Sequence, residues 1–109
     1  MQGFPGQFFN FCGKLSVEQS SALISCGCIF IGVDSGPMHV ANYLRKPLIA
    51  LFSARDLSGK WYPQGKEAYV LQGDAKCRGC MLEDGCPNDH ICMKNISVKS
   101  VIGKLRNFF

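Results

Sequence analysis

The segment of clearest chemical interest occupies positions 34 to 39 and reads Asp34, Ser35, Gly36, Pro37, Met38 and His39. Aspartate or serine can cap a helix, and proline suits the first helical turn. The free amides and positive dipole end of a helix that begins here suit phosphate, and Gly36 lets an anion approach the backbone without meeting a β-carbon. His39 can donate to a phosphate or sugar oxygen. The segment therefore predicts a site for a diphosphate-linked ligand, although turn and cap chemistry alone also explains four of its residues.

Cysteines form a second candidate site, because four of them fall within 16 residues: Cys77, Cys80, Cys86 and Cys92. A Cys-x-x-Cys pair offers two thiolates to a tetrahedral ion, and the other two thiols can complete a structural zinc site. The spacing of the second pair is wider than usual, and His90 can replace one thiol. Two disulfides, free thiols and an iron–sulfur site remain alternative interpretations. The other cysteines, Cys12, Cys26 and Cys28, are expected in the core as small hydrophobic residues.

Length and composition suit one globular domain spanning residues 1–109, since the chain has a mass of 12.0 kDa and 47% hydrophobic residues. The net charge of +4 comes from scattered basic residues, which argues against a nucleic-acid-binding protein. The longest strongly apolar run, at 48–52, is far shorter than the ~20 residues that span a bilayer. No basic, apolar leader is visible, so we expect a cytoplasmic protein.

The first half of the chain alternates strand-like and helix-like segments. Phenylalanines at 8–11 suggest a short strand. Ser16 and Gln19 form a capping box, and the helix it opens should run to about Ser25, bury Ala22 and Leu23, and end at Gly27. The continuous apolar run at 29–33 predicts a central strand covered on both faces.

The following segments complete a parallel sheet. A helix should begin at residues 34–37 and stop at Pro47, and a buried strand should follow at 48–53. Strand, helix and strand in this order form a βαβ unit with a right-handed crossover. Residues 69–71 suggest a further strand, and Ser97 caps a helix over 97–109.

These elements predict an α/β fold with about four parallel strands, three helices and a Cys-rich loop at 73–96. The loops at 34–39 and 53–56 then share the carboxyl edge of the sheet, where ligands of open α/β sheets bind. Such a small sheet is half of a Rossmann-like nucleotide-binding domain.

The runs at 30–41 and 46–52 resemble glycosyltransferase family 9, the family of the ADP-heptose:lipopolysaccharide heptosyltransferases. Weaker similarity appears at Gly13–Ser16, at Trp61 and Pro63, and at Cys92, Met93 and Ile96. The resemblance extends over about residues 10–105.

This resemblance implies a GT-B fold, of which the chain matches the distal part of the C-terminal domain that binds the nucleotide sugar. Asp34, Ser35, Gly36 and His39 would contact the diphosphate and sugar of an ADP-heptose-like donor. The parent reaction is an inverting, metal-independent transfer to a lipopolysaccharide acceptor. The implied location is the cytoplasm or the cytoplasmic face of the inner membrane, and zinc in the cysteine loop would be structural.

Departures from the family pattern limit what we expect of the isolated chain. No segment matches the acceptor-binding N-terminal domain with its catalytic carboxylate, or the donor-binding lysine. Arg45 stands where glycine is common, and Ser53–Arg55 replaces a Gly-Pro-Thr type of loop. We therefore expect no sugar transfer by this chain alone, and association with the missing domain or with a second copy. The alternative function is a non-enzymatic, zinc-stabilised α/β interaction module.

Overall fold

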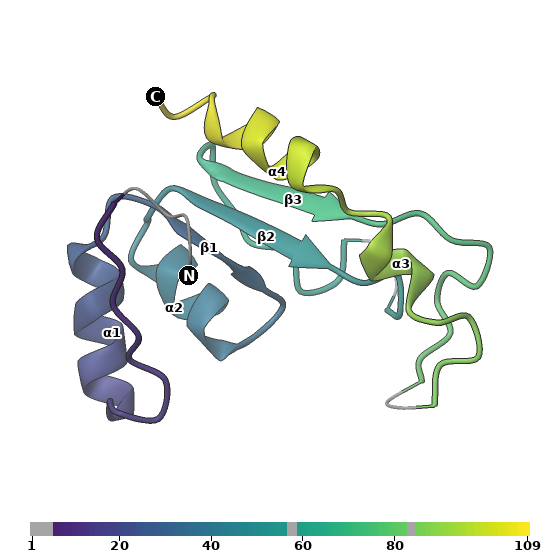
Figure 1. Cartoon of the computed structure of the whole chain (residues 1–109), viewed down its shortest axis with the longest axis horizontal. Coiled ribbons are helices and arrows are strands. Elements are labelled where there is room, and N and C mark those ends of the chain that lie inside the picture. The colour runs from purple at the N-terminus through teal and green to yellow at the C-terminus, as the bar shows by residue number, and fades with distance from the viewer. Residues whose placement is uncertain (1–5, 57–58, 83–84) are drawn as a thin grey trace.

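A computed structural model describes residues 6–56, 59–82 and 85–109. Its described part contains one parallel sheet of three strands in the order β1-β2-β3. The strands are β1 (Phe30–Val33), β2 (Leu48–Phe52) and β3 (Ala68–Gln72). The helices are α1 (Val17–Cys26), α2 (Gly36–Tyr43), α3 (Ile91–Lys94) and α4 (Val98–Leu105). This small α/β fold confirms the predicted class, a Rossmann-like fragment (Figure 1).

The first helix begins where the sequence predicted. The Ser16 hydroxyl accepts from the Gln19 amide at 3.1 Å, and the Gln19 side chain accepts from the Ser16 amide at 2.9 Å. This capping box satisfies amides that the first helical turn leaves without partners. Gly27 is the C-cap, as expected.

The two faces of the sheet are covered by different helices. Side chains of a strand alternate between faces, and the even-numbered residues of β2, namely Leu48, Ala50 and Phe52, form the core with Met38 and Ala41 of α2. On the opposite face α4 covers β2 and β3 (Figure 1). There the ring of Phe108, just beyond α4, lies edge-on to Tyr69 of β3 at 5.3 Å.

The loop at 73–96 is closed at its base by a close backbone approach. Gly73 is buried, and a β-carbon there would lie 1.3 Å from the carbonyl oxygen of Cys92. The Asn95 side chain also donates to the Asp74 carbonyl at 2.6 Å. Only glycine allows the two ends of the loop to meet in this way.

Several predictions about individual elements are wrong. Residues 8–11 form no strand, so the sheet has three strands among the described residues rather than about four. There are four helices there rather than three, because α3 forms within the cysteine loop. The phenylalanines at positions 8, 9 and 11 are exposed, and the described chain places no strand beside them to pair with.

The predicted burial of the first half of the chain is also wrong in places. β1 is an edge strand with alternate residues exposed, because α2 covers one of its faces and α4 packs mainly against β2 and β3. α1 packs against α2 and buries none of its residues, so Ala22 and Leu23 are exposed. The three cysteines expected in the core are exposed as well. In the described part of the chain, no helix is both long and apolar enough to cross a membrane.

Candidate functional site

The predicted ligand loop lies at the carboxyl end of β1, where it leads into α2. Ser35 occupies the N-cap position, but its hydroxyl donates to the Val33 carbonyl at 3.1 Å and does not cap the helix. The His39 amide makes the first helical bond, to the Ser35 carbonyl at 3.2 Å. The amides of Gly36 and Met38 precede that bond and receive no side-chain cap, so they are the donors that a bound anion can satisfy.

The surface over this helix start is open. A β-carbon built on Gly36 would meet no atom within 4 Å, and the residue is exposed. A cavity of about 330 Å³ adjoins it and is lined by Leu15, Val17, Ser20, Ser21, Ile24, Gly36, Pro37 and Val40. Sequence reasoning missed the α1 residues of this wall, because only the packing of α1 on α2 brings them to the loop.

Asp34 and His39 approach each other across the loop. Their side chains lie 3.7 Å apart, from Nε2 to Oδ1, and both are partly exposed. This separation is longer than a hydrogen bond, so the N–H of the imidazole can face a ligand oxygen.

Met38 departs from the predicted set, because its side chain is fully buried in the core against the even-numbered residues of β2. It anchors the helix to the sheet, and only its backbone amide can take part in a site. Pro37 lies in the first helical turn, as expected.

The neighbouring loop after β2 is held by the cysteine loop, a contact that the sequence did not indicate. The amide of Gly79 donates to the Ala54 carbonyl at 2.6 Å, and the amide of Met81 donates to the Arg55 carbonyl at 3.0 Å. The Arg55 side chain donates to the Leu82 carbonyl at 2.5 Å. The Cys77–Cys80 turn therefore borders the carboxyl edge of the sheet.

The structure does not bring the four predicted ligand cysteines together. Every cysteine is a free thiol. Across residues 6–56, 59–82 and 85–109, no three His, Cys, Asp or Glu side chains are arranged to hold a metal ion. Cys86 accepts a hydrogen bond from the His90 amide at 3.4 Å. In this conformation the loop does not fit a tetrahedral zinc ion, and the zinc site stays a prediction.

A parallel sheet with an open, glycine-containing helix start at its carboxyl edge defines a fragment of the Rossmann-like class. The family model described as glycosyltransferase family 9 (heptosyltransferase) matches residues 1–91. The chain belongs to this glycosyltransferase family.

Individual relatives agree with the family match. The chain is 29% identical over 98 residues to lipooligosaccharide heptosyltransferase 2 of Campylobacter jejuni (serotype O:6), a match that covers 89% of the chain and 31% of that protein. It is 48% identical over 44 residues to lipopolysaccharide heptosyltransferase 3 of Escherichia coli, which covers 40% of the chain and 13% of that protein. The chain thus spans about a third of the length of the Campylobacter relative, and its match to the Escherichia coli relative covers a smaller share of that protein. No solved structure matches it.

Proposed function

We propose that this chain is the donor-binding part of a glycosyltransferase of lipopolysaccharide core synthesis, with a nucleotide diphosphate sugar resembling ADP-heptose as its ligand. The observation that carries this proposal is the open helix start at Gly36, where amides without a side-chain cap face free space at the carboxyl edge of the sheet. Family membership supports the reaction class, and the names of the relatives, lipooligosaccharide and lipopolysaccharide heptosyltransferases, support lipopolysaccharide as the acceptor.

In this proposal each polar group of the loop has a separate task. The amides of Gly36 and Met38 bind diphosphate oxygens along the helix dipole. The Ser35 hydroxyl, which donates to the Val33 carbonyl in the structure, turns to donate to a diphosphate oxygen, and Pro37 fixes the turn. Asp34 accepts from sugar hydroxyls, and the N–H of His39 donates to a phosphate or sugar oxygen. These fixed donors stabilise the negative charge that grows on the departing nucleoside diphosphate.

The cavity beside the loop is the proposed place for the nucleoside. Its volume of about 330 Å³ and its largely aliphatic wall from α1 and α2 suit a flat, partly apolar group. Serines 20 and 21 of α1 supply the polar edge.

Transfer of the sugar requires catalytic and acceptor-binding residues in addition to the donor site described above. We propose that an acceptor-binding domain supplies the catalytic carboxylate, and that it or a second copy covers the open sheet. The proposed location of the enzyme is the cytoplasmic face of the inner membrane. The 109-residue chain by itself should bind donor without transferring sugar.

Titration calorimetry with ADP and ADP-heptose tests donor binding. Gly36→Ala should leave the fold intact, since its β-carbon meets no protein atom, but the methyl group would obstruct an anion at the backbone. We expect Gly36→Ala and His39→Ala each to weaken binding by at least about tenfold, the effect of losing a hydrogen bond to a charged group.

The matched control is His90→Ala, which removes the other histidine and should leave donor binding unchanged. Absence of saturable binding to the unaltered chain would refute the proposal. A donor affinity that Gly36→Ala leaves intact would place the ligand elsewhere.

The alternative proposal, a zinc-stabilised interaction module, depends on the four cysteines of the loop. Metal analysis of protein purified without chelator should then find one zinc per chain, and chelation should unfold the loop. A folded, metal-free protein whose thiols all react with a thiol reagent would eliminate the zinc site. The donor-binding proposal is independent of this outcome.

A further inference from the structure

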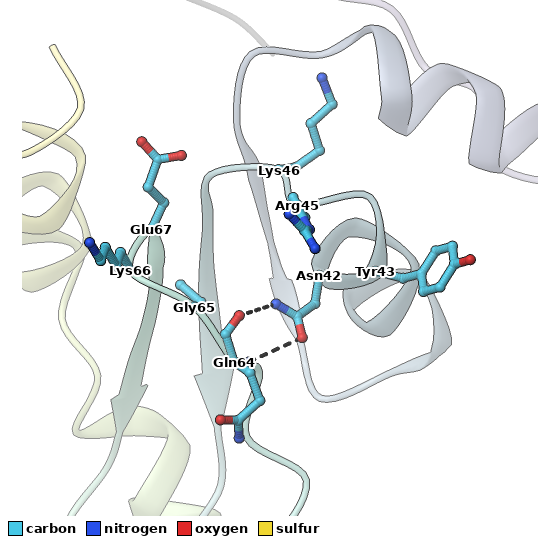
Figure 2. A pocket seen from close by; sticks show the side chains of 9 residues that line it. Asn42, Tyr43, Arg45, Lys46, Gln64, Gly65, Lys66 and Glu67 are labelled. Carbon is cyan, nitrogen blue, oxygen red and sulfur yellow. Dashed lines mark hydrogen bonds between the residues drawn. The ribbon is translucent and has the colours of Figure 1, made fainter.

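A second cavity lies at the amino edge of the sheet, away from the ligand loop. It has a volume of about 580 Å³, within the range of small-molecule sites. One side comes from the end of α2 and the turn after it, and the other from the segment that leads into β3 (Figure 2). The carboxyl edge with Gly36 and this edge are at opposite ends of the same strands, so a ligand here would not compete with a donor.

Two hydrogen bonds between Asn42 and Gln64 join the two sides of this cavity. The Asn42 side chain donates to the Gln64 carbonyl at 2.6 Å, and its oxygen accepts from the Gln64 amide at 3.1 Å (Figure 2). Asn42 thus satisfies both backbone groups of Gln64, as a neighbouring strand would. This fixed connection means that the cavity is formed before any ligand arrives.

Arg45 is held at the rim in an unusual backbone conformation. Its φ is 57°, and it follows α2 in a Schellman motif, in which the Lys46 amide donates to Ala41 and the Arg45 amide donates to Asn42. Glycine is the usual residue at such a position, because a side chain there is strained. An arginine here costs stability and places a guanidinium group beside the cavity, which is a reason to look for a ligand.

The charges of the lining are mainly positive. The lining contains three cations, Arg45, Lys46 and Lys66, and one carboxylate, that of Glu67. In the part of the chain that the structure describes, none of these three cations forms an ion pair. Tyr43 on the same rim is 86% exposed. Arginine and lysine without ion-pair partners are typical of surfaces that bind phosphate groups, including those of lipid headgroups.

We propose that this amino-edge cavity binds a phosphate group, carried either by an anionic lipid headgroup or by a free phosphorylated solute. Arg45 supplies a planar fork for two phosphate oxygens, and the lysines from the two sides add point charges. A lipid ligand would hold the chain on an anionic membrane while leaving the Gly36 loop free at the other edge.

Two probes distinguish the sources of the phosphate. The full chain is sedimented with vesicles of phosphatidylcholine alone or mixed with phosphatidylglycerol, and it is separately titrated with inorganic phosphate and pyrophosphate. Binding to the mixed vesicles without binding of the free anions indicates a lipid headgroup. Saturable binding of the free anions, without vesicle binding, indicates a solute. Binding to neither probe overturns the proposal.

Variants connect the binding to the cavity. Arg45→Gly removes a charge and relieves the backbone, so lost binding cannot be ascribed to misfolding. We expect it and Lys66→Gln each to weaken binding roughly fivefold, the effect of one basic residue near an anionic surface. Lys99→Gln on α4 makes the same charge change outside the cavity. If Lys99→Gln weakens binding as much as the cavity variants do, the attraction is a general effect of net charge, and the proposed site is wrong.

Discussion

Strands β1 and β2 lie side by side and carry similar apolar sequences, yet their burial differs. Ile31 of β1 is aligned with Ile49 of β2, and the two side chains point to the same face of the sheet. Ile49 is fully buried, whereas Ile31 is 43% exposed. The reason is that α4 packs mainly against β2 and β3, while β1 is the edge strand beside β2. An apolar run therefore indicates a strand, while burial depends on the helix that covers it.

The largest expected effect tests this difference directly. Ile49→Ala should destabilise the protein by about 3 kcal/mol, since it removes buried methyl groups and leaves a cavity. Ile31→Ala should cost less than about 1 kcal/mol, because much of that side chain is already in water. Urea unfolding followed by circular dichroism measures both. Equal losses would mean that a partner covers the exposed face of β1 in solution.

A smaller loss of stability is expected at Gly73, where β3 passes into the cysteine loop and two backbone segments lie close together. Gly73→Ala places a methyl group 1.3 Å from the Cys92 carbonyl oxygen, so one of the two backbone segments must move. Overpacking of this kind costs about 2 kcal/mol. The control is Gly103→Ala in α4, which meets no atom within 4 Å and should gain up to about 1 kcal/mol from helix propensity. Thermal unfolding of both variants measures the contrast, and a neutral Gly73→Ala would contradict the close approach.

The smallest effect concerns the turn between α2 and β2, the connection that places the two strands side by side. Arg45→Gly should stabilise the protein by about 1 kcal/mol, because glycine adopts a left-handed conformation without strain. Arg106→Gly is the matched control at the end of α4, where φ is −63° and glycine offers no relief. Urea unfolding should show a gain for Arg45→Gly alone. A loss there would mean that the guanidinium group makes a stabilising contact that outweighs the strain.

Much of the fold was predictable from local signals. The capping box at Ser16, the cap at Ser97, the helix stop before Pro47 and the apolar runs of β2 and β3 all gave elements close to those observed. The prediction at residues 8–11 failed because a strand needs a neighbour to bond with, and aromatic composition does not provide one.

The ligand loop was visible as a motif, but its surroundings were not. Residues 34 to 39 are contiguous, so their types and order pointed to a helix start at a sheet edge. The walls of the adjoining cavity come from α1, and the amino-edge cavity combines residues 42–46 with residues 64–68. The zinc site at the cysteines stays a prediction: spacing leaves the path of the intervening loop undefined, and among the described residues no three His, Cys, Asp or Glu side chains are arranged to hold a metal ion.

Amino-acid order was sufficient to specify the helix caps at Ser16 and Ser97, the βαβ connection and the glycine at the proposed ligand loop, because each depends on interactions within a few residues. The exposed face of β1, the buried position of Met38 and the pairing of Asn42 with Gln64 arise differently. They depend on which distant segments meet, and packing of the whole chain settles that.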